Sequence, residues 1–542
     1  MKRFVSLLCL AALVVAMFAG CGSTAPAASS APASSSAAAS TEASATPAPA
    51  AAPEEINVMV WDRGNNKFSD ANMTVADNAL TRYIQEQVLA SKNVKVTYVA
   101  SPRSGSDDKV NAMMAGGNAP DLILTYSRDV FGNFATQGGL TDLTSLLQSD
   151  GQNILKYIGK ETLDVGVLDG KQFAIMTRRG IQVARHTGYI RKDWLDKLGL
   201  AVPKTNEELI AALYAFKEKD PGGLGDKNIP WGMGGVTDTE MFYLSYVNQY
   251  ITKPYEGENL WTYQEFSSIM NPEAKAGFAA MNKMYNDGII SKDFAVDTKN
   301  DKFIADVSNG YVGFTLMDSF AIPGNGWDAA AKEKAPDAKY VPVKAFTGVN
   351  GEFKNPAEPT YGTYIMVPKK SEAKAAAVVR YLDWLADPVN AQNVRYTPTQ
   401  TTDADGLPVG PTEEDNIAKN YPATPDDLNI LNKHFAFMDE EAKVIASFAW
   451  MKSVAKEDLP DMVRGSTTDM IVYPVQQALL PNSSKYGKAV QDACLQMAYK
   501  CISAPADQFE ATYASEFQKV MQAGFDKILA EKQDYYTKNV KK

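Results

Sequence analysis

Side chains that commonly carry out catalysis are scarce in this chain of 542 residues. Its two histidines, His186 and His434, have neither the spacing of metal ligands nor a neighbouring acid that would form a catalytic triad. The sequence also contains no Gly-x-Ser-x-Gly motif and no phosphate-binding loop. We therefore predict a protein that is not an enzyme. The alternative is a surface glycosidase or lyase, because a catalytic carboxylate pair could be present among the 64 acidic residues.

One acidic segment has part of the pattern of a calcium-binding loop. Asp403, Asp405 and Gly406 have the required spacing, but Thr401 and Thr412 occupy the first and twelfth positions, where carboxylates are needed. In such loops the twelfth residue is a glutamate that binds calcium through both oxygens. We therefore expect a polar turn here, and we predict no cofactor and no metal site.

Cys21 lies in the sequence context of a cysteine that is acylated. A positively charged start and an apolar run over residues 4–17, too short to span a bilayer, precede it, and small residues flank it. The pattern is typical of a bacterial lipoprotein signal, with Phe18 at the position that usually holds leucine. We predict a signal peptide over residues 1–20 and attachment to the extracytoplasmic face of the cell membrane through acyl chains such as palmitate. The alternative is a secretory signal cleaved near Ala19.

The segment after this cysteine has the composition of a flexible tether. Residues 22–53 are almost entirely alanine, serine, proline and threonine, with Glu42 as the single charged residue. Such a segment cannot bury enough apolar surface to offset the entropy of ordering its backbone. We therefore assign residues 21–53 to the lipidated cysteine and a disordered tether. The whole-chain net charge of −10 argues against nucleic acid or anionic lipid as a partner.

Besides Cys9 in the signal peptide and Cys21, the chain has two cysteines, Cys494 and Cys501. Their spacing of seven residues places them on one face of a helix and roughly 10 Å apart, which is too far for a disulfide. We expect two buried free thiols. A disulfide is the alternative, and it would require the helix to break near residues 498–500.

The folded part begins with alternating strand and helix patterns. An apolar strand is predicted over residues 56–61, a helix follows from Asp77, and residues 94–99 alternate as a second strand. A helix over residues 108–115 and an apolar strand over residues 121–126 continue the series. This alternation predicts an α/β fold with a mainly parallel sheet and helices on both faces.

A second series of the same kind begins after Tyr189. Thr205 and Glu208 have the spacing of a capping box and predict the start of a helix. The C-terminal third has mainly helical patterns. The other predicted elements are strands over residues 231–235, 311–317 and 364–368, a helix that stops at Asp387, and helical patterns over residues 509–536.

Five short motifs stand in a defined order along the chain. They are Ala-Pro-Asp-Leu-Ile (119–123), Gly-Gly-Leu-Thr-Asp-Leu (138–143), Tyr-Ile-Arg-Lys-Asp-Trp-Leu-Asp-Lys-Leu-Gly-Leu (189–200), Tyr-Val-Gly-Phe (311–314) and Tyr-Leu-Asp-Trp-Leu (381–385). In this order and spacing they resemble the extracellular solute-binding proteins of ABC importers, specifically the large carbohydrate-type group (family 1). The likeness extends over nearly the whole mature chain.

The resemblance implies a two-lobed, periplasmic-binding-protein-like α/β fold with crossing hinge strands and a helical C-terminal part. Lobe 1 would comprise residues 54–178 and 354–445, and lobe 2 would comprise residues 179–353 and 446–542. The implied function is capture of a sugar or oligosaccharide between the lobes and its delivery to the membrane subunits of an ABC importer, by a protein that is a monomer. A receptor of the same fold for a non-sugar nutrient is an alternative.

In this family the solute binds at the carboxyl ends of strands, where loops and helix N-termini are exposed. Aromatic rings suit the apolar faces of sugars, and charged groups suit their hydroxyls. Alternative roles are core packing for Trp61 and surface ion pairing for Arg178. Some family members have tryptophan in place of Phe320. Carrying the family's positions onto this sequence gives the ligand-binding candidates Trp61, Asp62, Arg63, Tyr126, Ser127, Arg128, Asp129, Arg178, Gln182, Glu240, Phe242, Tyr243, Met317, Asp318 and Phe320.

Overall fold

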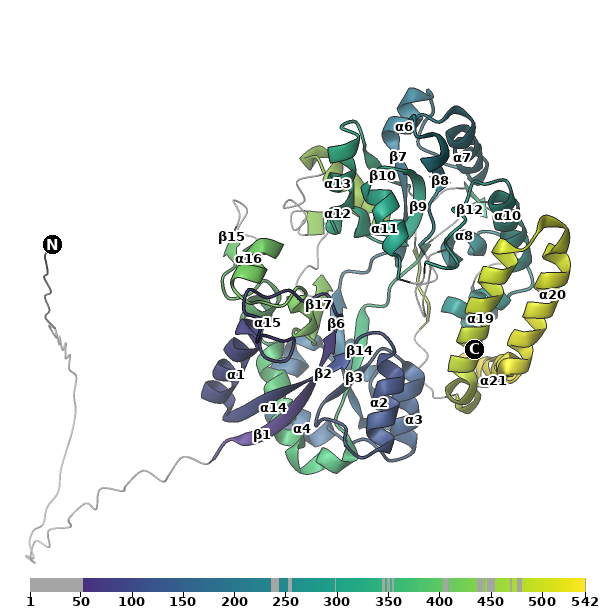
Figure 1. Cartoon of the computed structure of the whole chain (residues 1–542). Coiled ribbons are helices and arrows are strands. Elements are labelled where there is room, and N and C mark those ends of the chain that lie inside the picture. Colours follow the sequence, from purple (N-terminus) through teal and green to yellow (C-terminus); the bar gives the residue numbers. More distant parts are fainter. Residues whose placement is uncertain are drawn as a thin grey trace, which may run out of the picture. The chain divides into compact units, whose positions relative to one another are not determined.

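The structure is a computed structural model, and the residues that it describes begin at Ala52 (Figure 1). Cys21, most of the tether, the acidic segment 403–406, and the candidates Glu240 and Phe242 lie outside the described residues. The described residues are 52–234, 243–251, 256–297, 299–343, 347–348, 351–352, 355–402, 408–409, 411–435, 442, 444–445, 454–467, 470–474 and 480–541.

Two groups of strands make up the first sheet (Figure 1). β1 and β2 pair in parallel, and β17, β6, β14 and β3 follow one another in a four-stranded group. A parallel bridge between Val58 and Leu122 connects the two groups, so β3 continues next to β1. The bounds are β1 (Glu54–Asp62), β2 (Val94–Pro102), β3 (Ile123–Thr125), β6 (Ala174–Gly180), β14 (Tyr361–Met366) and β17 (Asn432–Phe435).

Helices cover this sheet. α1 and α14 contact each other and β2, whereas α2 and α3 contact β3. Residues 58–61 of β1 are all buried, because apolar side chains of a strand covered on both faces need not alternate with polar ones. The bounds are α1 (Ala79–Lys92), α2 (Ser106–Ala115), α3 (Arg128–Thr136), α4 (Thr144–Asp150) and α14 (Ala375–Ala386).

The second sheet has the strand order β10, β7, β9, β8. The prediction of a strand over residues 231–235 is wrong in its extent, because β8 ends at Trp231. Gly232 still donates to the carbonyl of Phe314, but the glycine-rich chain beyond it has low strand propensity and leaves the sheet. The bounds are β7 (His186–Arg191), β8 (Ile229–Trp231), β9 (Val312–Asp318), β10 (Tyr340–Val343), α6 (Lys192–Lys197) and α7 (Asn206–Lys219).

The prediction of a mainly parallel sheet is wrong. β14 runs antiparallel to both β3 and β6, and β7 runs antiparallel to both β9 and β10. Parallel pairing occurs between β1 and β2, β6 and β17, and β8 and β9. β6 leads through residues 181–185 into β7, so the chain passes directly from one sheet to the other. Parallel neighbouring strands need a long crossover connection, usually a helix. Strands through which the chain passes from one sheet to the other lack such a crossover, so they need not be parallel to their neighbours.

Two helix ends test the predicted capping residues. At the start of α7, the Thr205 hydroxyl accepts from the backbone N–H of Glu208 at 3.1 Å, as predicted. The Glu208 carboxylate, however, accepts from the backbone N–H of Lys204 at 2.7 Å, so the predicted capping box is half formed. α14 ends as predicted before Asp387, whose carboxylate caps the next helix, α15 (Pro388–Arg395).

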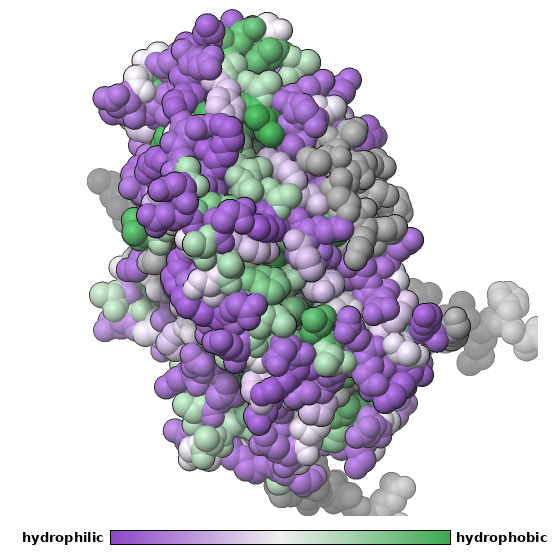
Figure 2. All heavy atoms as spheres, turned by 90° about the vertical axis from the view of Figure 1, so that its right-hand side faces the viewer, coloured by the Kyte–Doolittle hydropathy of each residue, from purple (hydrophilic) through white to green (hydrophobic). Residues whose placement is uncertain are grey.

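The C-terminal helices pack on the second sheet's layer of helices, which confirms the predicted helical C-terminal part. α19 and α20 contact α10 (Figure 1), and hydrophilic side chains predominate on the face that Figure 2 shows. Cys494 and Cys501 are buried free thiols on unbroken α19, as predicted. Burial raises the pKa of the Cys501 thiol to about 12. The bounds are α10 (Ala274–Asn286), α19 (Pro481–Ser503), α20 (Phe509–Val520) and α21 (Asp526–Tyr535).

Two large apolar cores correspond to the two sheets. The first gathers buried side chains from residues 56–176 and 364–431, and the second gathers them from residues 190–343 and 490–528. The molecule therefore has the two-lobed α/β fold that the sequence predicts. The residue at which each lobe begins and ends stays a prediction.

Candidate ligand-binding site

Two aromatic side chains meet at the carboxyl edge of the first sheet. Trp61 lies at the end of β1 and Tyr126 directly follows β3. Their rings stack with centroids 5.1 Å apart and planes inclined by 16°. Because β1 and β3 run parallel beside each other, their carboxyl ends fall at the same edge of the sheet. The structure thus brings together two of the candidates.

Trp61 is the buried member of this aromatic pair. Its side chain is buried, with 1% of the residue exposed, and its indole N–H donates to the Ser106 hydroxyl on α2 at 2.9 Å. Tyr126 is half-buried. Trp61 therefore positions the phenol ring of Tyr126, and Tyr126 is the member of the pair that a solute can reach.

Two arginines that the sequence analysis did not nominate lie over this aromatic pair. The Cζ of Arg103 is 4.6 Å from the Trp61 ring centroid and 4.9 Å from that of Tyr126. The Cζ of Arg179, on β6, is 5.8 Å from the Tyr126 centroid. Guanidinium groups at these distances are attracted to the faces of aromatic rings. Arg103 directly follows β2, so the strand-end rule that nominated Trp61 and Tyr126 would have found it if applied to β2 as well.

The charged groups around the pair differ in how they are compensated. Arg179 forms an ion pair with Glu358 at 2.7 Å, and both side chains are largely buried. Asp107 accepts from the Thr125 hydroxyl at 2.6 Å, and burial raises the pKa of its carboxyl although Thr125 and Arg103 both lower it. A raised pKa means that this carboxylate gains less from its surroundings than it loses by leaving water.

Arg63 forms a two-pronged ion pair with Asp427. Its Nε and Nη2 lie 2.5 and 2.9 Å from the two carboxylate oxygens. The hydrogen bonds to Asp427 raise the pKa of the Arg63 guanidinium. Since Asp427 belongs to the segment that follows residue 424, this pair fastens the end of β1 to a distant part of the chain, and Arg63 is committed to that contact.

Two of the three further candidates at this edge, Asp62 and Ser127, make hydrogen bonds with the backbone. The Asp62 carboxylate accepts from the backbone N–H of Gly64 at 2.9 Å and closes the turn after β1. The Ser127 hydroxyl accepts from the N–H of Val130 at 3.2 Å and caps α3. Arg128 is the first residue of α3 and is half-buried. These contacts account for Asp62 and Ser127 without a ligand.

Three candidates reach other parts of the molecule. Arg178 donates through Nη1 to the carbonyl of Tyr157 at 2.9 Å, and the Gln182 amide lies 3.5 Å from the carbonyl of Glu358. The Asp129 carboxylate lies against Gly487 of α19, where a Cβ would come within 2.2 Å of an Asp129 oxygen. The structure does not place these side chains on the Trp61–Tyr126 pair.

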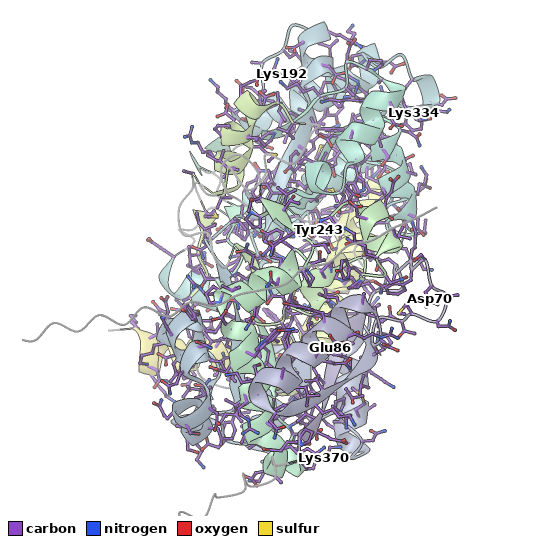
Figure 3. All side chains as sticks on the ribbon, turned by 90° about the vertical axis from the view of Figure 1, so that its left-hand side faces the viewer. Asp70, Glu86, Lys192, Tyr243, Lys334 and Lys370 are labelled. Atoms are coloured by element: carbon purple, nitrogen blue, oxygen red, sulfur yellow. The ribbon has the colours of Figure 1, made fainter. Side chains whose placement is uncertain are left out.

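Tyr243, a candidate in the second lobe, is buried in that lobe's core. One per cent of the residue is exposed, and burial raises the pKa of its phenol well above the usual value. Figure 3 shows Tyr243 within the body of the molecule, whereas Lys334 and Lys370 extend at its outline. As placed here, its ring packs among core side chains and offers no surface to a solute.

The candidates at the carboxyl end of β9 comprise one exposed residue and two buried residues. The Asp318 side chain is 57% exposed and lies 3.8 Å from Nε2 of buried His186 on the neighbouring strand. Met317 packs in an apolar cluster with Tyr189, and Phe320 packs in another with Leu459. Asp318 is therefore the described candidate of the second lobe that is open to solvent.

A cavity of about 310 Å³ opens away from this edge, beside α4. Its lining includes Leu147, Leu163, Lys160 and Asp164, and none of the thirteen ligand-binding candidates that the structure describes lines it. Lys160 is already paired with Asp164 at 2.6 Å. Volume alone therefore does not mark this cavity as the functional site, and the strand edge has the side chains suited to a ligand.

The described ranges contain neither a candidate metal site nor a candidate membrane-spanning helix. Among these residues, no three histidine, cysteine or carboxylate side chains are grouped so that they could hold a metal ion. Within the same part of the chain, no helix is both long and apolar enough to cross a membrane. The predicted absence of a metal stays a prediction for the remaining residues.

Two α/β lobes joined by crossing strands, with aromatic and cationic side chains at the strand ends, define a two-lobed binding protein. The chain belongs to the family of bacterial extracellular solute-binding proteins, whose model matches residues 70–392. This match covers more than half of the chain. It agrees with the family that the five sequence motifs indicate.

Individual relatives are more distant. The chain is 28% identical over 311 residues to Lipoprotein LipO of Bacillus subtilis (strain 168), covering 55% of this chain and 58% of that protein. It is 27% identical over 320 residues to the polygalacturonan/rhamnogalacturonan-binding protein YtcQ of the same strain, covering 56% and 60%. The alignments thus span less than two thirds of these relatives. Among solved structures, the alginate-binding protein AlgQ2 without calcium ion superposes with a TM-score of 0.62 at 17% identity, covering 90% of this chain and 98% of that one.

Proposed function

We propose that this protein captures a sugar or oligosaccharide between its lobes and delivers it to the membrane subunits of an ABC importer. The observation that carries the proposal is the stacked pair Trp61–Tyr126 at the strand ends, flanked by Arg103 and Arg179. An aromatic face suits the C–H face of a sugar ring, and guanidinium groups beside it donate hydrogen bonds to the sugar's oxygens.

The second lobe would complete the site. Asp318 is exposed at the carboxyl end of β9, and a carboxylate accepts hydrogen bonds from sugar hydroxyls. A solute that contacts Tyr126 on one lobe and Asp318 on the other binds the closed arrangement more tightly than the open one. Its differential contacts would therefore drive closure.

A carbohydrate is favoured over another nutrient by two independent points. The aromatic and guanidinium side chains at the edge suit a ring with many oxygens, and the curated relative YtcQ is named as a binder of galacturonans. The family and the relative YtcQ are binding proteins, so we propose binding without turnover, by a monomeric protein.

Anchoring at the membrane is a separate part of the proposal. Cys21, within its lipoprotein-type signal, would carry the acyl chains, and the tether would hold the folded lobes away from the surface. The name of the relative LipO supports this assignment. Fractionation checks it: a Cys21→Ser protein should leave the membrane fraction, and retention after a high-salt wash would disprove the lipid anchor.

A panel of defined oligosaccharides, screened by thermal shift, tests the central part of the proposal. A bound glycan should raise the unfolding temperature in a concentration-dependent way, and Tyr126→Ala should reduce that shift. Tyr311→Ala, a half-buried tyrosine on the second lobe, is the control and should leave it unchanged. Product analysis of each stabilising glycan should recover it intact. Shorter products would identify an enzyme, and stabilisation only by amino acids or peptides would identify a different solute.

A further inference from the structure

We infer that the solute carries a carboxylate, as a uronic acid residue does, and that Arg103 binds this group. The inference deepens the proposed function and rests on it, because it places the carboxylate of a bound sugar beside the Tyr126 ring. Arg103, which directly follows β2, would thus determine the preference of the protein for acidic over neutral sugars.

Arg103 lies on the aromatic pair and has no ion-pair partner among the described residues. Its guanidinium lies over both Trp61 and Tyr126, yet it donates no hydrogen bond and forms no ion pair with any residue that the structure describes. Its Nε is buried and has no hydrogen-bond partner. A buried donor without an acceptor is costly, so the protein leaves the hydrogen-bonding capacity of this guanidinium unused.

The neighbouring arginines each have a protein acceptor. Arg63 is paired with Asp427, Arg179 is paired with Glu358, and Arg178 donates to the carbonyl of Tyr157. The Nε of Arg179, like that of Arg103, is buried without a hydrogen-bond partner, but Glu358 compensates the charge of Arg179. Of these four arginines, Arg103 is the one whose guanidinium has no ion pair and no hydrogen bond to a described residue.

Asp107 does not remove the positive charge of Arg103. It is the acidic group that interacts electrostatically with Arg103, but its carboxylate is committed to the Thr125 hydroxyl and forms no ion pair with the guanidinium. The chain as a whole has a net charge of −10, so an anionic solute is repelled at long range and needs a local cation to bind.

The geometry favours a carboxylate over a hydroxyl. The two terminal nitrogens of Arg103, Nη1 and Nη2, are not buried as Nε is, and the planar edge that they form matches the two oxygens of a carboxylate. A sugar hydroxyl can accept only part of this hydrogen bonding and does not compensate the charge. An acidic sugar should therefore bind more tightly than its neutral counterpart.

Matched pairs of probes test the inference. The acidic members are α-1,4-linked trigalacturonate and β-1,4-linked trimannuronate, and the neutral members are the galactose and mannose trisaccharides with the same linkages. Calorimetry on the full mature chain should show wild-type protein binding an acidic member at least about tenfold more tightly than its neutral partner. Arg103→Gln should lose about tenfold to a hundredfold in affinity for the acidic member and little for the neutral one.

Two further variants keep the test decisive. Arg103→Lys keeps the charge without the planar fork and should retain part of the preference for the acid. Arg82→Gln removes an arginine of α1 that pairs with Asp77 and should leave both affinities unchanged. Equal or tighter binding of the neutral members would overturn the inference while leaving the proposed function intact, as would an unchanged preference in Arg103→Gln. If neither member of any pair binds, sugar capture itself fails together with the inference.

Discussion

At the scale of single residues, the motifs that identify the family hold the fold together. Asp121 accepts from the backbone N–H of Asn57 at 2.8 Å, from the Ser371 hydroxyl at 2.6 Å and from Lys374 at 2.9 Å. Asp383 accepts in the same way from the N–H of Asn153 at 2.6 Å. Both aspartates join segments far apart in the sequence. These two motif residues therefore belong to the framework of the lobe, and neither is among the ligand-binding residues that we propose.

Asp121 should be important for stability. Burial raises the pKa of its carboxyl, but the hydrogen bonds from Ser371, Asn57 and Lys374 outweigh burial and leave that pKa below its usual value. Asp121→Asn should lower the free energy of unfolding at neutral pH by about 1–3 kcal/mol, because it weakens three hydrogen bonds to one charged acceptor. Denaturant unfolding measures this difference. Glu86→Gln, on the exposed face of α1 (Figure 3), is the control and should stay within about 0.5 kcal/mol.

The difference in free energy of unfolding between wild type and Asp121→Asn should depend on pH. Because the folded-state pKa is lower than the unfolded one, the stabilising contribution is complete above the unfolded pKa of about 3.9 and disappears as pH falls through the folded pKa. The stability gap between wild type and Asp121→Asn should therefore be constant from pH 7 to about pH 5 and narrow below pH 4. A gap that widens on acidification would show that Asp121 is not the ionised acceptor described here.

At the scale of elements, the sequence predicts those whose signal is local. The apolar run of β1 and the helical spacing of α14 are enough to place both elements. The direction of a strand cannot be predicted in this way. The antiparallel pairing of β14 and β7 with their neighbours depends on partners that are distant in sequence. Arg103 was within reach of the strand-end rule, but its contact with the Tyr126 ring depends on the order of strands in the sheet, which the sequence does not give. Met317 and Tyr243 were nominated because the sequence does not tell which side of a strand end or of a helix start faces the core.

Gly313 shows how one element fits another. This glycine lies on β9 beneath α6 and α7, and a Cβ there would approach the rings of Phe216 and Trp194 to 2.6 and 2.7 Å. Gly313→Ala should therefore lower the free energy of unfolding by about 1–3 kcal/mol through overpacking. Adding Phe216→Leu to this variant should cost less than Phe216→Leu costs alone, because it relieves the crowding. Additive losses measured by denaturant unfolding would argue against a steric cause.

At the scale of the whole molecule, two cores are linked by the crossing from β6 to β7 and by later returns of the chain. This arrangement permits each lobe to stay rigid while the segments between them absorb a change of conformation. The site proposed here has Tyr126 on the first lobe and Asp318 on the second. Neither lobe alone would hold a solute tightly, so binding and closure should occur together.

Small-angle scattering on the mature protein, with and without a glycan that binds it, tests this central claim most directly. Wild-type protein should contract when the glycan is added. At a glycan concentration that just saturates wild type, Tyr126→Ala and Asp318→Ala should stay largely extended, since each loses about 1–3 kcal/mol of contacts made in the closed state. A wild-type protein that binds the glycan without contracting, or both variants contracting as wild type does, would contradict capture between the lobes at these residues.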